Sequence, residues 1–161
     1  MPTETERKFL VIGDSWRSQA TGTLYRQGYL VAEPDRTVRV RIAGDRGFLT
    51  IKGKTEHISR PEFEYPIPLK DAAELLDTLC LRPLIEKIRY RLESEGLLWE
   101  IDEFRGENAG LILAEVELTN PNQVLSLPDW VGAEVSHDPR YYNASLIRYS
   151  YSQWGKRDQA L

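Results

Sequence analysis

Six segments of this 161-residue chain carry two like-charged side chains separated by one residue. Because side chains alternate across an extended strand, such neighbours share one face of a strand, and apolar residues fill the other face. Lys8 and Lys52 add cations to two of the predicted strands. The pattern predicts a sheet with a charged face and an apolar face. The pairs are Glu4/Glu6, Arg39/Arg41, Glu62/Glu64, Lys87/Arg89, Glu100/Asp102 and Glu115/Glu117.

Turn-forming residues divide the chain into short segments with a period of two, which is typical of strands. The predicted strands are 3–12, 24–32, 36–43, 47–53, 61–68, 85–93, 97–104 and 111–119. Hairpin turns are expected at 43–47 and 94–96. Eight short strands with few helices predict a mainly β (α+β) fold, either an antiparallel barrel or a sandwich.

Three helices are expected between and after these strands. The first covers 70–82 and places Ala72, Leu76, Leu79 and Cys80 on one face, with Pro83 ending it. Asn120-Pro121 and Asp138-Pro139 each read as a helix N-cap followed by a proline at the first helical position. They predict a short helix reaching Leu127 and a longer one running toward Trp154.

The composition bounds the class of protein. We expect one domain over residues 1–155 and a polar tail over 156–161. The net charge of −4 argues against a general nucleic-acid binder. No apolar run approaches the ~20 residues of a membrane helix, and the single cysteine, Cys80, cannot form an internal disulfide. These features predict a soluble, cytoplasmic protein.

The charged face allows two interpretations. On any one strand, it could simply face water. A solvated face normally mixes charge signs, however, whereas each pair here has a single sign. If the sheet closes, the charges line its interior, and enclosed ions require a hydrated cavity with a matching ligand. Arginines and lysines suit phosphate oxygens, and carboxylates suit a hard divalent cation, so polyphosphate with Mg²⁺ or Mn²⁺ satisfies both.

The charged segments, in this order, resemble the CYTH superfamily, also called triphosphate tunnel metalloenzymes. Tyr25-Arg26-Gln27-Gly28-Tyr29-Leu30 resembles a segment of its compact bacterial members, and Val135 to Leu146 is similar to their C-terminal plug helix. The resemblance covers residues 3 to about 150. Its motifs are Glu4-Thr5-Glu6-Arg7-Lys8 (ExExK), Arg39-Val40-Arg41, Thr50-Ile51-Lys52, Arg60-Pro61-Glu62-Phe63-Glu64, Glu86-Lys87-Ile88-Arg89-Tyr90, Trp99-Glu100-Ile101-Asp102 and Ala114-Glu115-Val116-Glu117.

This resemblance implies an eight-stranded antiparallel closed barrel, a tunnel, with a few helices packed outside and a C-terminal plug helix. The phosphate-binding residues it implies are Lys8, Arg39, Arg41, Lys52, Lys87 and Arg89. The metal ligands it implies are Glu4, Glu6, Glu62, Glu64, Asp102, Glu115 and Glu117. The catalytic residues it implies are Glu4, Glu6, Lys87, Glu115 and Glu117, and further site candidates are Glu100, Tyr29, Arg60, Tyr141 and Asn143.

The implied activity is hydrolysis of a triphosphate that depends on Mg²⁺ or Mn²⁺, with inorganic tripolyphosphate as the leading substrate. Three alternatives stay open: a class IV-type adenylate cyclase, a thiamine or nucleoside triphosphatase, and a non-catalytic polyphosphate or nucleotide sensor. The cyclase motif HFxxR is not seen in the sequence. We expect a triphosphate-containing small molecule as partner, no nucleic acid and no membrane. The sequence leaves open whether the chain forms a homodimer.

Overall fold

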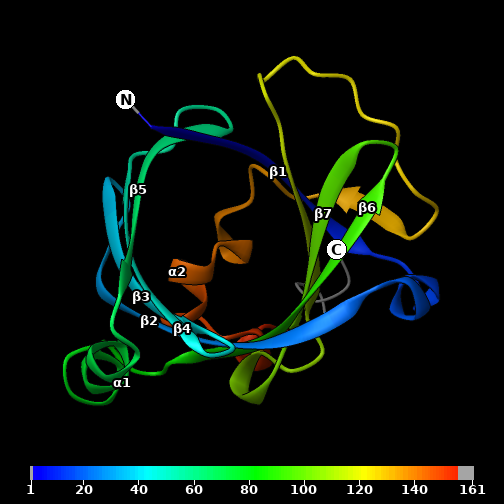
Figure 1. Ribbon diagram of the computed structural model, residues 1–161. Coiled ribbons are helices and arrows are strands. Elements are labelled where there is room, and N and C mark those ends of the chain that lie inside the picture. The colour runs from blue at the N-terminus through cyan, green and yellow to red at the C-terminus, as the bar shows by residue number, and fades with distance from the viewer. Residues whose placement is uncertain (1, 156–161) are drawn as a thin grey trace.

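The computed structural model describes residues 2–155, which form a nine-stranded antiparallel sheet that curls into a ring (Figure 1). The strands are β1 (Thr3–Val11), β2 (Thr21–Glu33), β3 (Arg36–Ala43), β4 (Arg46–Gly53), β5 (Ser59–Ile67), β6 (Ile85–Ser94), β7 (Leu97–Phe104), β8 (Ile112–Glu117) and β9 (Val131–Glu134). The helices are η1 (Ser15–Gln19), α1 (Leu69–Thr78), η2 (Gly106–Asn108), η3 (Pro139–Tyr141), α2 (Asn143–Leu146) and η4 (Tyr151–Gln153). The predicted polar tail, 156–161, lies outside the described residues.

Eight of the strands close into a barrel, as predicted. The sheet has the order β5-β4-β3-β2-β6-β7-β8-β1-β9, and β5 also pairs with β1. This closure is short, because only Thr3–Thr5 pair with Ser59–Pro61. Later residues of β1 pair with β9 instead. The sequence analysis missed β9, a four-residue strand too short to show a period.

The predicted strands are confirmed, with shifts at their ends. β2 starts three residues earlier than expected because Thr21–Thr23 pair with Arg89–Arg91 of β6. Both hairpins are confirmed. At the second, Glu95 and Gly96 have φ values of 50° and 77°, the left-handed conformations that a two-residue hairpin turn requires.

The outward faces of the strands are covered unevenly. Trp16 of η1 and Trp130 pack with Trp99 and Val116 in one apolar cluster, and α1 covers Val40. On β4 part of the apolar face is left open, since Ile51 is 39% exposed.

The inward face is charged over only part of its length. Toward one end of the barrel, strands β1, β6, β7 and β8 each place an apolar residue two positions from a charged one, and these residues form a buried cluster with Tyr29 and the C-terminal segment. They are Leu10, Ile85, Phe104 and Leu113. The expectation of charge along the whole face is therefore wrong. The apolar cluster closes this end and avoids the cost of enclosing further ions.

Helix α1 packs outside the barrel as predicted, but it ends earlier than expected (Figure 1). Ala72 and Leu76 are fully buried against Val40. The backbone amides of Leu79 and Cys80 both donate to the Leu75 carbonyl, which ends the helix at Thr78. Leu79 is consequently 64% exposed, so its predicted place on the buried face is wrong. Among residues 2–155, no helix has the length and apolar character needed to cross a membrane.

The predicted helix over 120–127 is absent. Asn120 does cap a turn, because its side chain accepts a hydrogen bond from the Asn122 amide at 2.9 Å. The chain then runs without helical structure to Pro128. Val124 is 91% exposed and Leu127 is 49% exposed. A short helix needs a buried apolar face, and here only Leu125 is partly buried, against the cluster that contains Trp130.

The predicted C-terminal helix is broken into η3, α2 and η4. Asp138 caps η3 as expected, but Tyr142 and Ser150 adopt extended conformations with ψ of 135° and 150°. The Tyr141 carbonyl accepts a hydrogen bond from Lys8 Nζ at 3.1 Å rather than from a helical amide. The segment still acts as the predicted plug, since α2 lies inside the ring of strands (Figure 1).

Truncating Leu76 should test the packing of α1. We expect Leu76→Ala to lower the free energy of unfolding by about 2–5 kcal/mol, because the side chain is fully buried between the helix and β3. Leu79→Ala, three residues later but exposed, should change it by less than about 0.5 kcal/mol. Urea denaturation of both variants measures the difference. Equal losses would contradict the helix end at Thr78.

Candidate active site

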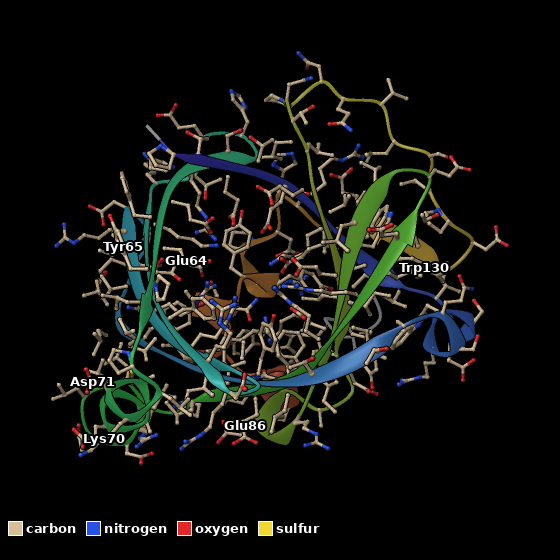
Figure 2. All side chains as sticks on the ribbon, viewed as in Figure 1. Glu64, Tyr65, Lys70, Asp71, Glu86 and Trp130 are labelled. Atoms are coloured by element: carbon tan, nitrogen blue, oxygen red, sulfur yellow. The ribbon has the colours of Figure 1, made fainter. Side chains whose placement is uncertain are left out.

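The charged side chains of the predicted strands converge on one cavity inside the barrel, with a volume of about 700 Å³. Glu64 points into the ring of strands and the next residue, Tyr65, points outward (Figure 2). Of the sequence-predicted site residues, all but Asp102 and Tyr141 line this cavity. They are Glu4, Glu6, Lys8, Tyr29, Arg39, Arg41, Lys52, Arg60, Glu62, Glu64, Lys87, Arg89, Glu100, Glu115, Glu117 and Asn143.

A second hollow of about 960 Å³ lies beside the seam between β1 and β5. It shares Lys54, His57, Ile58 and Arg60 with the barrel cavity. None of the six predicted phosphate-binding cations lines it. The convergence of charge therefore places the candidate site inside the barrel.

Asp102 lies behind two of the cavity's cations rather than on the cavity wall. Its carboxylate accepts hydrogen bonds from Lys87 Nζ at 2.7 Å and from Arg89 Nε and Nη2 at 2.7 and 2.8 Å. Its side chain is 1% exposed. Burial alone would raise the pKa of Asp102, but Arg89 and Lys87 lower it further than burial raises it. Asp102 is thus an ionised counter-ion that fixes both cations.

Lys87 and Arg89 respond differently to this shared partner. Burial lowers the pKa of the Lys87 ammonium, and Asp102 opposes that shift. Burial also acts to lower the pKa of Arg89, but Asp102 outweighs it and raises that pKa. Arg89 also lies 3.3 Å from Glu100 and 3.8 Å from Glu115. Its charge is therefore spread over several carboxylates.

A second group of ion pairs lies near the short β1–β5 closure. Lys52 Nζ contacts Glu4 at 3.0 Å and Glu62 at 3.1 Å, and Arg60 Nε contacts Glu4 at 3.4 Å. Burial alone would raise the pKa of Glu4, but Lys52 and Arg60 hold it well below its usual range. On the neighbouring pair of strands, Lys8 lies 3.5 Å from Glu115.

Arg41 is the one cation among the six that forms no ion pair within residues 2–155. Its Nε donates to Gln27 Oε1 at 2.8 Å, and its guanidinium lies 4.9 Å from the centre of the Tyr25 ring. Burial, Arg39 and Arg89 lower the pKa of Arg41 to about 9, which leaves it charged at neutral pH. A buried cation without a carboxylate is a ready anchor for an anion.

Arg39 also has a hydrogen-bond donor that no described residue satisfies. Its Nη2 donates to Thr50 Oγ1 at 3.2 Å and lies 3.5 Å from Glu64. Its Nε is buried and has no hydrogen-bond partner among the described residues. Since a buried donor without an acceptor is costly, this atom marks a place where a ligand oxygen would be stabilised.

The carboxylates at the other side of the cavity are also incompletely satisfied. Glu6 and Glu117 face each other in the register of β1 and β8. Within the described part of the chain, neither carboxylate group forms a hydrogen bond or an ion pair. Burial and the nearby carboxylates of Glu115 and Glu4 raise the pKa of Glu6 to about 8. Burial and Glu4 also raise the pKa of Glu117.

These free carboxylates fit a hard divalent cation, which takes oxygen ligands and retains water. The other cavity carboxylates are held by lysines and arginines. Accordingly, no three acidic, histidine or cysteine side chains of residues 2–155 already converge as a metal cluster. The oxygen ligands that a metal would need are present, but most of them are paired with lysines and arginines.

The plug supplies two of the weaker candidates in different ways. Asn143 Oδ1 accepts hydrogen bonds from Lys87 Nζ at 2.9 Å and from Gln27 Nε2 at 3.0 Å. The Tyr141 ring instead packs against Trp154, and its carbonyl accepts a hydrogen bond from Lys8 Nζ at 3.1 Å.

Sequence reasoning missed Tyr25 and Gln27 as site residues. Gln27 is fully buried, and Tyr25 lies between the guanidinium groups of Arg41 and Arg89 at 4.9 and 5.0 Å. Neither is charged, so neither belongs to the pattern of like-charged pairs. The signal that could have found them is the same alternation, because Tyr25, Gln27 and Tyr29 share the inward face of β2.

Removing the shared counter-ion should destabilise the barrel. We expect Asp102→Asn to lower the free energy of unfolding by about 3–5 kcal/mol, because it leaves Lys87 and Arg89 buried without full compensation. Glu103→Gln is the matched control, since Glu103 forms an exposed ion pair with Arg17 and should cost about 1 kcal/mol or less. Chemical denaturation compares the two variants. Similar losses would refute the role given to Asp102.

Known proteins resemble this chain in sequence and in fold. A family model for the CYTH domain matches residues 2–151. An inorganic triphosphatase of Acetivibrio thermocellus is 51% identical over 154 residues, covering 96% of this chain and 99% of the relative. An inorganic triphosphatase of Nitrosomonas europaea is 36% identical over 152 residues, covering 89% and 96%. A crystal structure described as an inorganic triphosphatase has a TM-score of 0.63 and 34% identity, covering 91% of this chain and 95% of that one. The chain belongs to the CYTH domain family.

Proposed function

We propose that this protein is a divalent-metal-dependent inorganic triphosphatase, which hydrolyses tripolyphosphate to diphosphate and phosphate. The observation that carries the proposal is the division of charge in one enclosed cavity. Among residues 2–155, Arg41 is buried and has no carboxylate partner, and the carboxylates of Glu6 and Glu117 form no ion pair. A phosphate chain bound with a divalent cation would complement both. The names of the two relatives support the same substrate.

The phosphate chain would lie along the cations of the cavity wall. The two arginines of β3 would offer planar donors to phosphate oxygens, and the lysines would act as point charges. Arg41 and Arg39 would contribute most, because the first lacks an ion pair and the second has a free buried Nε. The proposed phosphate-binding residues are Lys8, Arg39, Arg41, Lys52, Lys87 and Arg89.

The metal would be held by carboxylates that face the cavity. Glu6 and Glu117 would bind the metal most readily, because neither carboxylate forms an ion pair among the described residues. Glu4, Glu62, Glu64 and Glu115 would join only by releasing part of their contact with lysines and arginines. Asp102 would act through Lys87 and Arg89 instead, given its place behind them. When bound, a divalent cation such as Mg²⁺ or Mn²⁺ would neutralise phosphate charge and polarise the scissile anhydride.

In the reaction, a water oxygen bonds to a terminal phosphorus and the bridging P–O bond breaks. The electron pair of the broken P–O bond leaves with the diphosphate. The protons of the attacking water are taken up by the products or by solvent. The cations would stabilise the negative charge of the transition state from fixed positions. Glu4, Glu6, Glu115 and Glu117 would hold and orient water, while Lys87 would contact the phosphate chain.

The remaining candidates would support these groups. Arg60 would position Glu4, with which it forms an ion pair at 3.4 Å. Glu100 would hold Arg89 and Arg91, which lie 3.3 and 3.2 Å from it. Tyr29 would shape the wall beside the apolar end of the barrel.

We also propose that residues 1–155 form one domain and that the protein acts in the cytoplasm. The barrel strands run through the chain from Thr3 to Glu117, and the plug returns into their interior. Cys80 is a buried free thiol. A single free cysteine agrees with a reducing compartment.

A substrate panel tests the proposed activity. Phosphate release should be fastest from tripolyphosphate, slower from ATP and thiamine triphosphate, and lost when a chelator removes Mg²⁺ or Mn²⁺. Release of cyclic AMP and diphosphate from ATP would instead identify a cyclase. Binding of these compounds without any turnover would identify a sensor.

Replacing a free carboxylate tests the metal assignment. We expect Glu117→Gln to lower turnover about tenfold or more at limiting Mg²⁺, with partial recovery at high Mg²⁺, because one oxygen ligand is weakened. Glu86→Gln, at the outer rim of the barrel (Figure 2), should leave turnover unchanged. Titration of activity against Mg²⁺ measures both variants. A wild-type metal dependence in Glu117→Gln would remove Glu117 from the metal site.

A further inference from the structure

We propose that Gln27 and Asn143 are positioning residues that form an uncharged bridge between two cations of the cavity, Arg41 and Lys87. The bridge holds these cations where a phosphate chain can reach them, without neutralising either. This inference rests on the proposed function, because it names how two of the phosphate-binding groups are placed.

The bridge is a continuous set of hydrogen bonds. Arg41 Nε donates to Gln27 Oε1 at 2.8 Å, and Gln27 Nε2 donates to Asn143 Oδ1 at 3.0 Å. Lys87 Nζ donates to the same Asn143 oxygen at 2.9 Å. Each amide thus presents its oxygen to a cation. Gln27 is fully buried and sits on the inward face of β2, next to β3 and β6, which carry the two cations.

The neutral charge of the bridge is what distinguishes it. Five of the six phosphate-binding cations, Lys87 among them, have a carboxylate within 4 Å, so within residues 2–155 only Arg41 of these six is held by an amide instead of a carboxylate. A carboxylate satisfies a donor but also cancels its charge. An amide oxygen satisfies a donor and leaves the charge available for an anion. Gln27 therefore stabilises Arg41 in a buried position while preserving its attraction for phosphate.

Asn143 makes the bridge depend on the plug. It is the first residue of α2, which lies inside the ring of strands (Figure 1). A second tie runs from Lys8 Nζ to the Tyr141 carbonyl at 3.1 Å. The C-terminal segment therefore contributes polar groups to the site as well as apolar packing to the end of the barrel.

The test compares Gln27→Met, Asn143→Ala and the double variant. Tripolyphosphate binding is measured by calorimetry in the presence of a chelator, and KM and kcat are measured with Mg²⁺. We expect each single variant to raise the Kd and KM about tenfold, or about 1.4 kcal/mol. The double variant should be little worse than the more affected single variant, because both substitutions break one bridge. Ser152→Ala, at an exposed position of the C-terminal segment that does not line the cavity, is the control and should leave Kd and KM unchanged.

Gln27→Glu tests whether the neutral charge of the Gln27 side chain, rather than its shape, supports tripolyphosphate binding. It keeps an acceptor for Arg41 but adds a carboxylate, so it should preserve the melting temperature and still weaken tripolyphosphate binding more than Gln27→Met does. A purely structural role predicts the reverse, with a lower melting temperature and unchanged binding. If Gln27→Met does not fold, Asn143→Ala decides the question by the same Kd criterion, because that residue is only half-buried.

Wild-type values of Kd and KM in the folded single variants would overturn the bridge while leaving the proposed function intact. Fully additive effects in the double variant would overturn it as well. Failure of the wild-type protein to bind or hydrolyse tripolyphosphate would overturn the proposed function itself, and the wild-type arm of the experiment shows this directly.

Discussion

The ion pairs around Asp102 are the interaction on which this barrel depends. Closing a sheet with one charged face encloses ionised side chains, and each of them loses hydration. Asp102 offsets much of that cost by accepting hydrogen bonds from both Lys87 and Arg89 while remaining 1% exposed. Two neighbouring strands are thereby fixed to each other through their inward side chains. The cations are held rigidly before any ligand arrives, which is the arrangement that electrostatic catalysis requires.

The remaining interior divides into regions of different chemistry. At one end, apolar residues and the plug exclude water. In the middle, the charge of Arg41 is left uncompensated, because its hydrogen-bond partner is the amide of Gln27 rather than a carboxylate. On the β1–β8 side, Glu6 and Glu117 lie opposite each other in the strand register, and neither carboxylate forms an ion pair among the described residues. A ligand that brings both anionic oxygens and a divalent cation relieves these two imbalances together, which explains why the same cavity contains both kinds of group.

The closed barrel was expected from the family resemblance, whereas most of its charged lining could be predicted from strand alternation alone. Strand alternation converts a spacing of two into a shared face, so Arg39 and Arg41 could be placed together from the sequence alone. Gln27 was not predicted as a site residue, because an uncharged side chain does not belong to a like-charged pair. The C-terminal plug was predicted as one continuous helix, but it is broken near Tyr141, whose carbonyl accepts a hydrogen bond from Lys8. These two residues are 133 positions apart, so no local sequence pattern could have predicted the contact. The predicted helix over 120–127 is absent, because Val124 and Leu127 have no surface to pack against.

The central claim is that the cavity recognises phosphate and divalent cation jointly. Thermal unfolding tests it most directly, with tripolyphosphate alone, Mg²⁺ alone and both together at matched concentrations. Because a ligand that binds only the folded state raises the melting temperature, the account predicts a shift for the pair that clearly exceeds the sum of the separate shifts. A shift equal to that sum, or one produced fully by tripolyphosphate in the presence of a chelator, would contradict it.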